Sequence, residues 1–187
     1  GLYQTYVTAH DTLNGPVANS HNLNTAGSGA GYELTFAATI DEKVTGVATD
    51  GFGHTVFTLS STGGNAGLYF GQTPNFNFGT DSGFTDGAAI LSGSIASGIS
   101  GYYTLGVGFG TFNLNANGLG IDPAVYDPAT INGGDAIFTL QLNPNGVTSG
   151  VTSVLGHSVG AGDFLLQSDG SLNLVAVPLP AALWLLL

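Results

Sequence analysis

Histidine and acidic side chains are the groups in this sequence that could hold a metal ion. The histidines are His10, His21, His54 and His157. None of them belongs to an H-x-H or H-E-x-x-H arrangement, so the sequence gives a zinc site no support. The acids that flank two loops are Asp81 and Asp86, and Asp122, Asp127 and Asp135. We expect these acids to be solvated turn residues. Calcium, which takes roughly six to eight oxygen ligands, is the alternative, and no other cofactor is expected.

A second chemical pattern is the segment Gly156–Gly160 (GHSVG), which matches the G-x-S-x-G arrangement around a nucleophilic serine. In α/β-hydrolases that serine lies on a strand-to-helix turn, and an acid and then a histidine follow later in the chain. Here Asp163 and Asp169 follow Ser158, but no histidine does. We interpret the segment as a turn and predict that the protein is not an enzyme. Hydrolysis at Ser158 is the third hypothesis for function.

The charge balance excludes one large class of partner. The sequence has 12 acidic residues and one basic residue, Lys43, which gives a formal net charge of −11. Neutralising nucleic-acid phosphates requires several Lys or Arg side chains, so nucleic-acid binding is not expected. Adsorption to anionic lipid headgroups is disfavoured for the same reason.

Short strand-like runs recur along the chain and must position any site. Tyr32–Ile40 (YELTFAATI) alternates in polarity, and β-branched and aromatic residues dominate the other runs. The other runs are Leu2–Thr8, His54–Ser60, Gly67–Gly71, Ala88–Ala96, Tyr102–Leu114, Asp135–Leu142, Phe164–Gln167 and Ser171–Val177. No stretch shows a sustained helical period. A short turn near Pro123–Tyr126 is the one exception considered.

Turn dipeptides that suit a positive φ lie between and beside these runs. They are Asn14-Gly15, Asp50-Gly51, Asp86-Gly87, Asn117-Gly118, Asn132-Gly133, Asn145-Gly146 and Asp169-Gly170. The last predicts a hairpin between Phe164–Gln167 and Ser171–Leu174. Many short strands with frequent turns predict an all-β, single-domain antiparallel β-sandwich, jelly-roll-like, over residues 1–177. An apolar C-terminal tail follows over residues 178–187.

The end of the chain carries a recognisable motif. Its residues are Val177, Pro178, Leu179, Pro180, Ala181, Ala182 and Trp184. This segment resembles the start of a PEP-CTERM sorting signal, although Leu179 stands where most members carry Glu. The runs Phe84–Ser94 and Gly162–Val177 resemble the body of flocculation-associated PEP-CTERM proteins. The resemblance implies a bacterial protein that is exported and processed by an exosortase, and it associates the protein with exopolysaccharide, biofilms and flocs.

The sequence leads us to expect a secreted structural protein of the bacterial cell surface or extracellular matrix. Gly1 in place of Met suggests that a signal peptide has been removed. Sheet edges are normally protected by charges, especially Lys, and this sequence has one Lys. We therefore predict homo-oligomers or filaments formed by adding the terminal strand Ser171–Val177 to a neighbour's sheet. Truncation before Ser171 is predicted to abolish assembly and leave a soluble domain.

The alternative function is a carbohydrate-binding module for exopolysaccharide. Jelly-roll domains often bind glycans with exposed aromatic side chains. The candidates here are Tyr102, Tyr103 and Tyr126. Aromatic residues of strands more often belong to the core, so binding of a polysaccharide by the monomer is the observation that would favour this alternative.

Overall fold

The computed structural model describes residues 1–7, 31–98, 100–105, 107, 109–123, 132–143, 150–163 and 165–175. Every regular element in these ranges is a β-strand, and no helix occurs among them. The strands are β1 (Leu2–Tyr6), β2 (Glu33–Thr49), β3 (Thr55–Gly71), β4 (Ala88–Ile95), β5 (Ser100–Thr104), β6 (Phe109–Ile121), β7 (Asp135–Asn143), β8 (Ser153–Val154), β9 (His157–Ser158) and β10 (Gln167–Val175).

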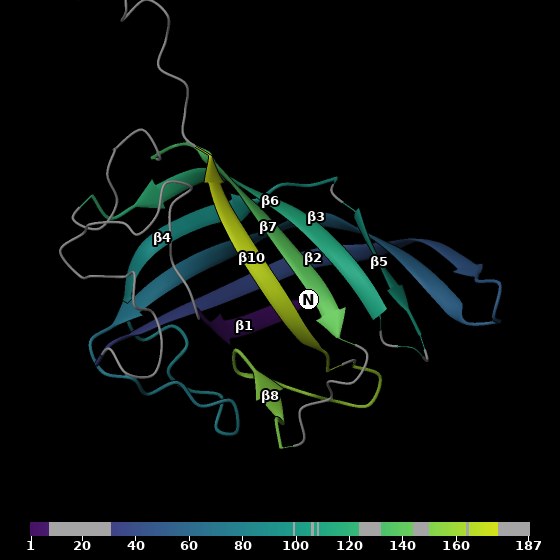
Figure 1. The fold of residues 1–187 in the computed structure, drawn as a ribbon, viewed down its shortest axis with the longest axis horizontal. Helices are drawn as coiled ribbons and strands as arrows, with labels where there is room; N and C mark the ends of the chain where they lie inside the picture. The colour runs from purple at the N-terminus through teal and green to yellow at the C-terminus, as the bar shows by residue number, and fades with distance from the viewer. Residues whose placement is uncertain are drawn as a thin grey trace, which may run out of the picture.

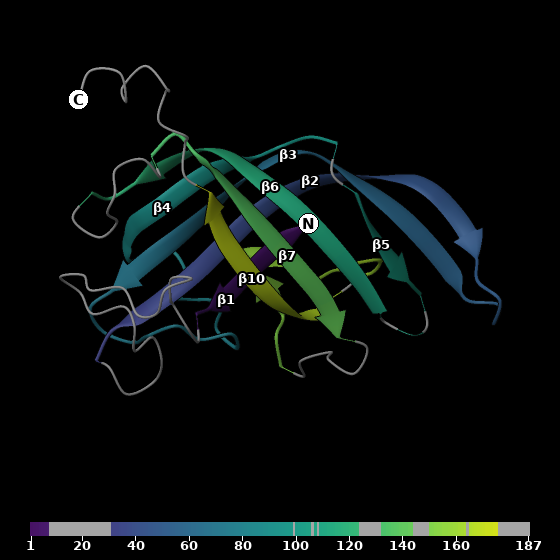
Figure 2. The same cartoon turned by 45° about the horizontal axis from the view of Figure 1, so that its top comes forward.

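Eight of the strands form one antiparallel sheet in the order β1-β2-β3-β4-β6-β7-β10, and β5 pairs with β3 and β6 beside this path. The strands β8 and β9 form a small separate hairpin. The large sheet folds over itself, so that β6, β7 and β10 cross over β1, β2 and β3 (Figures 1 and 2). The predicted all-β class and antiparallel β-sandwich are confirmed.

The core lies between these two layers. In β2 the alternating residues Leu34, Phe36, Ala38 and Ile40 are buried in one hydrophobic cluster with residues of β4, β6 and β7. The ring of Phe36 lies 4.6 Å from that of Phe138 in β7, although β2 and β7 are not neighbours in the sheet. Burial of apolar surface between the layers therefore holds the folded-over sheet together.

The long strands differ from the predicted runs. His54–Ser60 and Gly67–Gly71 were expected as separate strands, but β3 is continuous from Thr55 to Gly71. Glycines at positions 63 and 64, with φ of 154° and 133°, let the strand pass a register shift opposite Asp41 and Glu42. Conversely, the predicted run Tyr102–Leu114 is divided between β5 and β6, which pair with each other.

The predicted C-terminal hairpin is wrong. Asp169-Gly170 lies inside β10, which pairs with β7 along its whole length. A Cβ on Gly170 would lie 3.1 Å from both the Phe138 ring and the Tyr3 hydroxyl. Gly170 is therefore used for close packing between the layers and not for a turn.

Other turn predictions divide in the same way. Asp50-Gly51 does connect β2 to β3, and Asn132-Gly133 forms a turn just before β7. Asn117-Gly118 instead lies within β6, where Gly118 has a φ of 63° beside a register shift between β4 and β6. Asn14-Gly15, Asn145-Gly146 and the possible turn near Pro123–Tyr126 fall wholly or largely outside the described residues.

Candidate functional site

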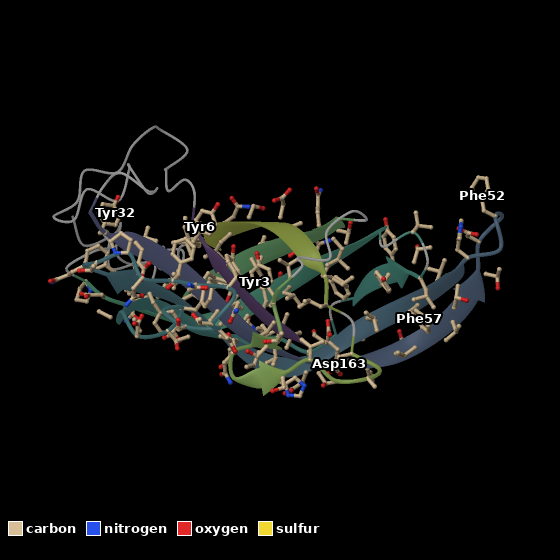
Figure 3. The ribbon with its side chains drawn as sticks, turned by 90° about the horizontal axis from the view of Figure 1, so that it is seen from below. Tyr3, Tyr6, Tyr32, Phe52, Phe57 and Asp163 are labelled. Carbon is tan, nitrogen blue, oxygen red and sulfur yellow. The ribbon has the colours of Figure 1, made fainter. Side chains whose placement is uncertain are left out.

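The far ends of β2 and β3 form a hairpin that we call the β2–β3 arm, residues 41–60. Strand β1 pairs with β2 from Thr35 to Thr39, and the backbone bonds between Gly1 and Ile40 close that ladder. The arm continues beyond this point and projects from the body of the molecule, with Phe52 at its tip (Figure 3). Its β3 side is covered by β5.

The β2 side of the arm is an open sheet edge. No strand among the described residues pairs with the outer side of β2 from Asp41 to Thr49. Asp50 N donates to His54 O, which makes Asp50–His54 a hydrogen-bonded pair. Hydrogen-bonded and non-hydrogen-bonded pairs alternate along antiparallel strands, so the next pair, Thr49–Thr55, exchanges no backbone hydrogen bonds. By alternation, Val47 and Thr49 direct their backbone N–H and C=O groups away from β3.

This edge is apolar as well as open. The exposed fraction of Val44 is 55% and that of Val47 is 65%. At the tip, Phe52 is 89% exposed, a large value for a phenyl ring that a folded chain usually buries. Exposed apolar side chains next to unpaired backbone groups are typical of an association surface.

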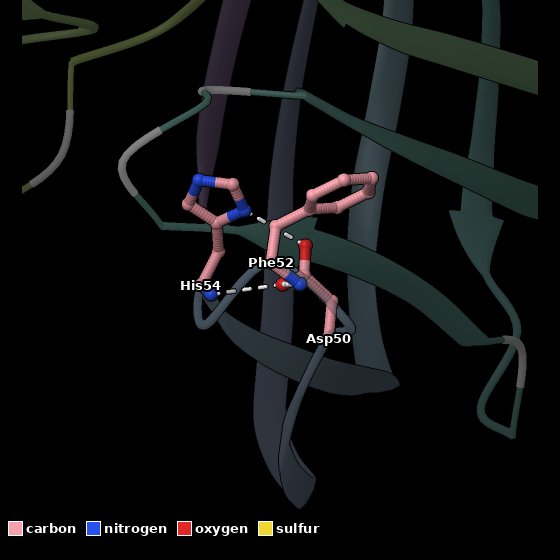
Figure 4. A network of polar contacts seen from close by, with 3 residues as sticks. All are labelled: Asp50, Phe52 and His54. Carbon is pink, nitrogen blue, oxygen red and sulfur yellow. Dashed lines mark hydrogen bonds and ion pairs between the residues drawn. The ribbon is translucent and has the colours of Figure 1, made fainter.

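A polar network fixes the tip behind Phe52 (Figure 4). One Asp50 carboxylate oxygen accepts from the backbone N–H groups of Phe52 at 2.9 Å and His54 at 2.8 Å. The other lies 2.8 Å from His54 Nδ1. The side-chain hydrogen bond from His54 is the main cause that lowers the pKa of Asp50, and backbone donors add to it. The ionised carboxylate holds the turn closed and leaves Phe52 projecting.

Two features protect part of the open edge. Lys43 carries the only basic side chain of the sequence, and the register shifts between Val44 and Gly46. Both a lysine and a bulge discourage pairing with another chain. The segment Gly46–Thr49 has neither, because it is uncharged and stays in regular register with Thr55–Thr58. We call this segment the distal edge.

The structure places the predicted donor strand in its own sheet. Ser171–Val175 pairs with Asp135–Thr139 of β7, and Leu172 and Leu174 pack against the core. The strand is thus already occupied within its own chain. The remaining part of the predicted segment and the complete sorting motif, Val177 to Trp184, lie outside the described residues.

The G-x-S-x-G segment lies on the β8–β9 hairpin. Ser158 is exposed on the two-residue strand β9, paired with Ser153 of β8. The adjacent His157 contacts Asp163 through Nε2 and Oδ2, 3.4 Å apart and exposed. Because His157 and Ser158 are neighbours in a strand, their side chains point to opposite faces. The segment is therefore part of a hairpin and not a strand-to-helix turn.

The other predicted site residues are dispersed. No group of three or more acids and histidines able to hold a metal occurs in the described ranges. Asp81 accepts hydrogen bonds from the backbone of β8–β9, whereas Asp86 accepts one from the Asn75 side chain. Asp122 follows β6 and Asp135 begins β7. His10, His21 and Asp127 fall outside the described residues.

The aromatic candidates for glycan binding lie on β5. Tyr102 pairs with Thr58 of the arm and is 40% exposed, and Tyr103 is half-buried beside it. Tyr126 falls outside the described residues. The two placed tyrosines follow each other in one strand, so they point to opposite faces and do not form a common aromatic platform.

The chain matches no family model, no curated protein and no solved structure at the significance required. The described part of the structure also contains no helix that is long and apolar enough to cross a membrane. Function must therefore be argued from the surfaces themselves.

Proposed function

We propose that this protein is a secreted structural protein of the bacterial cell surface or extracellular matrix that associates with itself by β-strand addition at the distal edge. The observation that supports this is the uncharged segment Gly46–Thr49, where no described strand pairs with the outward backbone groups of Val47 and Thr49. An exposed edge of this kind is a template for another strand.

A second copy of the chain supplies a suitable partner edge. Strand β10 ends the order of the large sheet and pairs with β7 alone among the described strands. Joining the distal edge of one copy to β10 of the next uses two different surfaces, so the contact repeats and builds a filament. Joining two distal edges would instead close a dimer. We propose the filament, in agreement with the matrix role.

Export and sorting form the remainder of the proposal and rest on the C-terminal motif. The Pro-Leu-Pro-Ala-Ala sequence from Pro178 to Ala182 resembles a PEP-CTERM signal. It supports placement at the cell surface or in the matrix after processing by an exosortase. Biofilm and floc formation are the settings in which such a filament would act.

Substitution of Val47 tests association at the distal edge. Val47→Lys places a charge beside the outward backbone groups, so we expect filaments to disappear from negative-stain electron micrographs and the sedimentation coefficient to become that of a monomer. Val47→Thr keeps a β-branched, uncharged residue and is expected to assemble as the wild type does. Filaments of unchanged length in Val47→Lys would disprove the distal edge, and wild-type particles no larger than dimers would disprove the filament.

A further inference from the structure

A groove of about 610 Å³ lies on the outer face of the sheet, over β2, β3 and β4. Its volume falls within the roughly 300–1,000 Å³ range of small-molecule sites. Its side is formed by the loop that connects β3 to β4, with Asp81 and Phe84, and by the turn of the β8–β9 hairpin, with Leu155 and Gly156. The loop and the turn meet where the Asp81 carboxylate accepts from the hairpin backbone.

The loop wall is attached firmly to the sheet. Thr35 Oγ1 donates to the Phe84 carbonyl at 2.8 Å, and Glu33 Oε2 accepts from the backbone N–H groups of Asn75 and Phe76. The Phe84 side chain is itself buried. Because both ends of this loop are bonded to β2, the groove is present without a ligand.

The floor of the groove is polar. It carries the side chains of Thr39, Asn65 and Ser92 with Gly67 between them. A Cβ on Gly67 would lie 2.9 Å from the Tyr69 hydroxyl and about as close to the ring, so the ring lies across the glycine. A half-buried tyrosine in this position offers an aromatic surface and a hydroxyl to the same ligand.

A buried amide at the side of the groove lacks a full set of partners. Gln4 is 8% exposed, and its Oε1 accepts from Leu155 N at 3.0 Å. Its Nε2 makes no hydrogen bond of ordinary geometry with the described residues. The same amide lies near enough to Asp81 to contribute to the lowered pKa of that carboxyl. Even with one N–H group directed at Asp81, the second N–H group of this buried amide has no acceptor among the described residues, and a ligand oxygen that accepted from it would be stabilised.

Charge restricts the kind of ligand. The lining contains one carboxylate, Asp81, and no Lys or Arg. Both carboxylate oxygens already accept backbone N–H groups, from Leu155 at 2.9 Å and Gly156 at 2.7 Å. An anionic polymer would be repelled by this carboxylate and by the net charge of −11, and a metal ion would find too few ligands.

We propose that this groove binds a neutral polysaccharide chain. Hydroxyl-rich sugars match the alternating hydroxyl, amide and carboxylate groups of the lining, and the C–H face of a sugar ring matches the Tyr69 ring. Gln4 Nε2 and Asp81 lie on one side of the chain, and Asn65 and Ser92 lie beneath it. This binding is separate from self-association, because the distal edge contributes no residue to the groove.

The experiment measures binding of the purified full chain to soluble neutral polysaccharides, namely a mixed-linkage β-glucan, xylan, galactomannan and dextran, by affinity electrophoresis and calorimetry. Alginate serves as the anionic comparison. We expect at least one neutral polymer to bind and alginate not to bind. Tyr69→Ala is expected to weaken binding about tenfold or more. Tyr69→Phe keeps the ring and is expected to weaken binding less than Tyr69→Ala does. Tyr102→Ala, outside the groove, is expected to bind as the wild type does.

Circular dichroism establishes that each variant is folded. If Tyr69→Ala does not fold, Ser94→Leu narrows the groove from its floor and is expected to abolish binding instead. Val47→Lys is expected to bind as the wild type does, which separates the groove from assembly. No binding to any of the four neutral polymers, a preference for alginate, or equal loss in Tyr69→Ala and Tyr102→Ala would each overturn the proposal. The proposal would also be overturned if the protein bound an unfolded polypeptide and none of the polysaccharides.

Discussion

Asp81 and Leu155 are the two residues other than glycine with a positive φ in the described ranges, at 53° and 49°. This backbone conformation costs a non-glycine residue roughly 1–2 kcal/mol. The two strained residues hold each other, because the Asp81 carboxylate accepts from the backbone N–H of Leu155 and of Gly156 beside it. Strain of this kind persists where surrounding contacts fix it, and here it shapes one side of the groove.

These hydrogen bonds give Asp81 a predictable effect on acid stability. Burial is the largest influence and raises the pKa of Asp81. Hydrogen bonds from Gly156, Ser153 and Leu155, together with the nearby Gln4 amide, lower it below the ordinary value. The unfolded chain therefore binds more protons than the folded chain near pH 4. The stability that this carboxylate contributes is present above about pH 4 and is lost as the pH falls through the lower folded value.

We expect Asp81→Asn to remove the pH-dependent stability that the Asp81 carboxylate contributes. The difference in free energy of unfolding between wild type and Asp81→Asn should be largest at pH 7 and should shrink as the pH falls below about 4. Urea denaturation at a series of pH values measures both curves. A difference that stays constant with pH would show that the Asp81 carboxylate makes no charge-dependent contribution.

For single residues, the sequence predicts whether a residue lies in a loop or a strand but not which distant residues it contacts. Asp81 is predicted as a solvated turn residue, and it does lie in a loop, but it is half-buried, with its carboxylate against the β8–β9 turn. Its partner Leu155 is 74 residues away along the chain, and no periodicity connects the two. Gln4 carries no motif at all, and its role follows only from the folding of β1 beneath the β8–β9 hairpin.

Among the elements, the β2–β3 arm depends on an unusual backbone at its base. Gly64 in β3 lies opposite Ile40 of β2, with a φ of 133°. A Cβ on Gly64 would lie 2.0 Å from the Thr39 carbonyl oxygen, which is backbone and cannot move aside as a side chain would. The glycine therefore allows β2 and β3 to continue past their register shift into the arm.

Substitution of this glycine should weaken the whole hairpin. We expect Gly64→Ala to lower the free energy of unfolding by more than about 1 kcal/mol, because the new methyl group forces the two strands apart. Gly51→Ala, in the exposed turn where a Cβ would contact nothing within 4 Å, should change it by less than about 0.5 kcal/mol. Denaturant unfolding compares the two, and equal effects would contradict the packing at Gly64.

The arm also shows where sequence patterns were sufficient and where they were not. The Asp50-Gly51 turn and the run His54–Ser60 are predicted from the sequence, but the predicted run Tyr32–Ile40 stops well before the end of β2 at Thr49. The edge on β2 is a different matter, since it depends on β1 pairing with Thr35 to Thr39 and on the absence of any other described strand beyond that pairing. Strand order is set by packing between the layers, which local sequence patterns do not contain. The sequence therefore predicts association through the C-terminal strand and not through the edge of β2.

At the scale of the whole molecule, strand β10 completes the large sheet and covers part of the core. The expectation that truncation before Ser171 leaves a soluble domain does not fit a strand paired along its length with β7. Removing Ser171–Val175 takes Leu172 and Leu174 off the core, and Leu172 is the cross-strand partner of Phe138. The sandwich class itself was predictable, because alternation and turn density determine it without knowledge of strand order.

We expect truncation before Ser171 to lower the free energy of unfolding by more than about 3 kcal/mol and to cause aggregation through the exposed β7 edge. Asn173→Ala, which alters an exposed side chain of the same strand, should change it by less than about 0.5 kcal/mol. Thermal and urea unfolding measure both. A truncated chain with the wild-type midpoint would show that β10 adds little to the fold.

The contact between β1 and the β8–β9 hairpin has a consequence for the order of events during synthesis. Gln4 meets Leu155 across a sequence separation of 151 residues, and Tyr3 packs on Phe138. The contacts of the first strand are therefore completed only after the chain has been made as far as Leu155. Such distant pairings make folding slow. Translocons accept unfolded chains, so late completion of the contacts of β1 is compatible with the export proposed above.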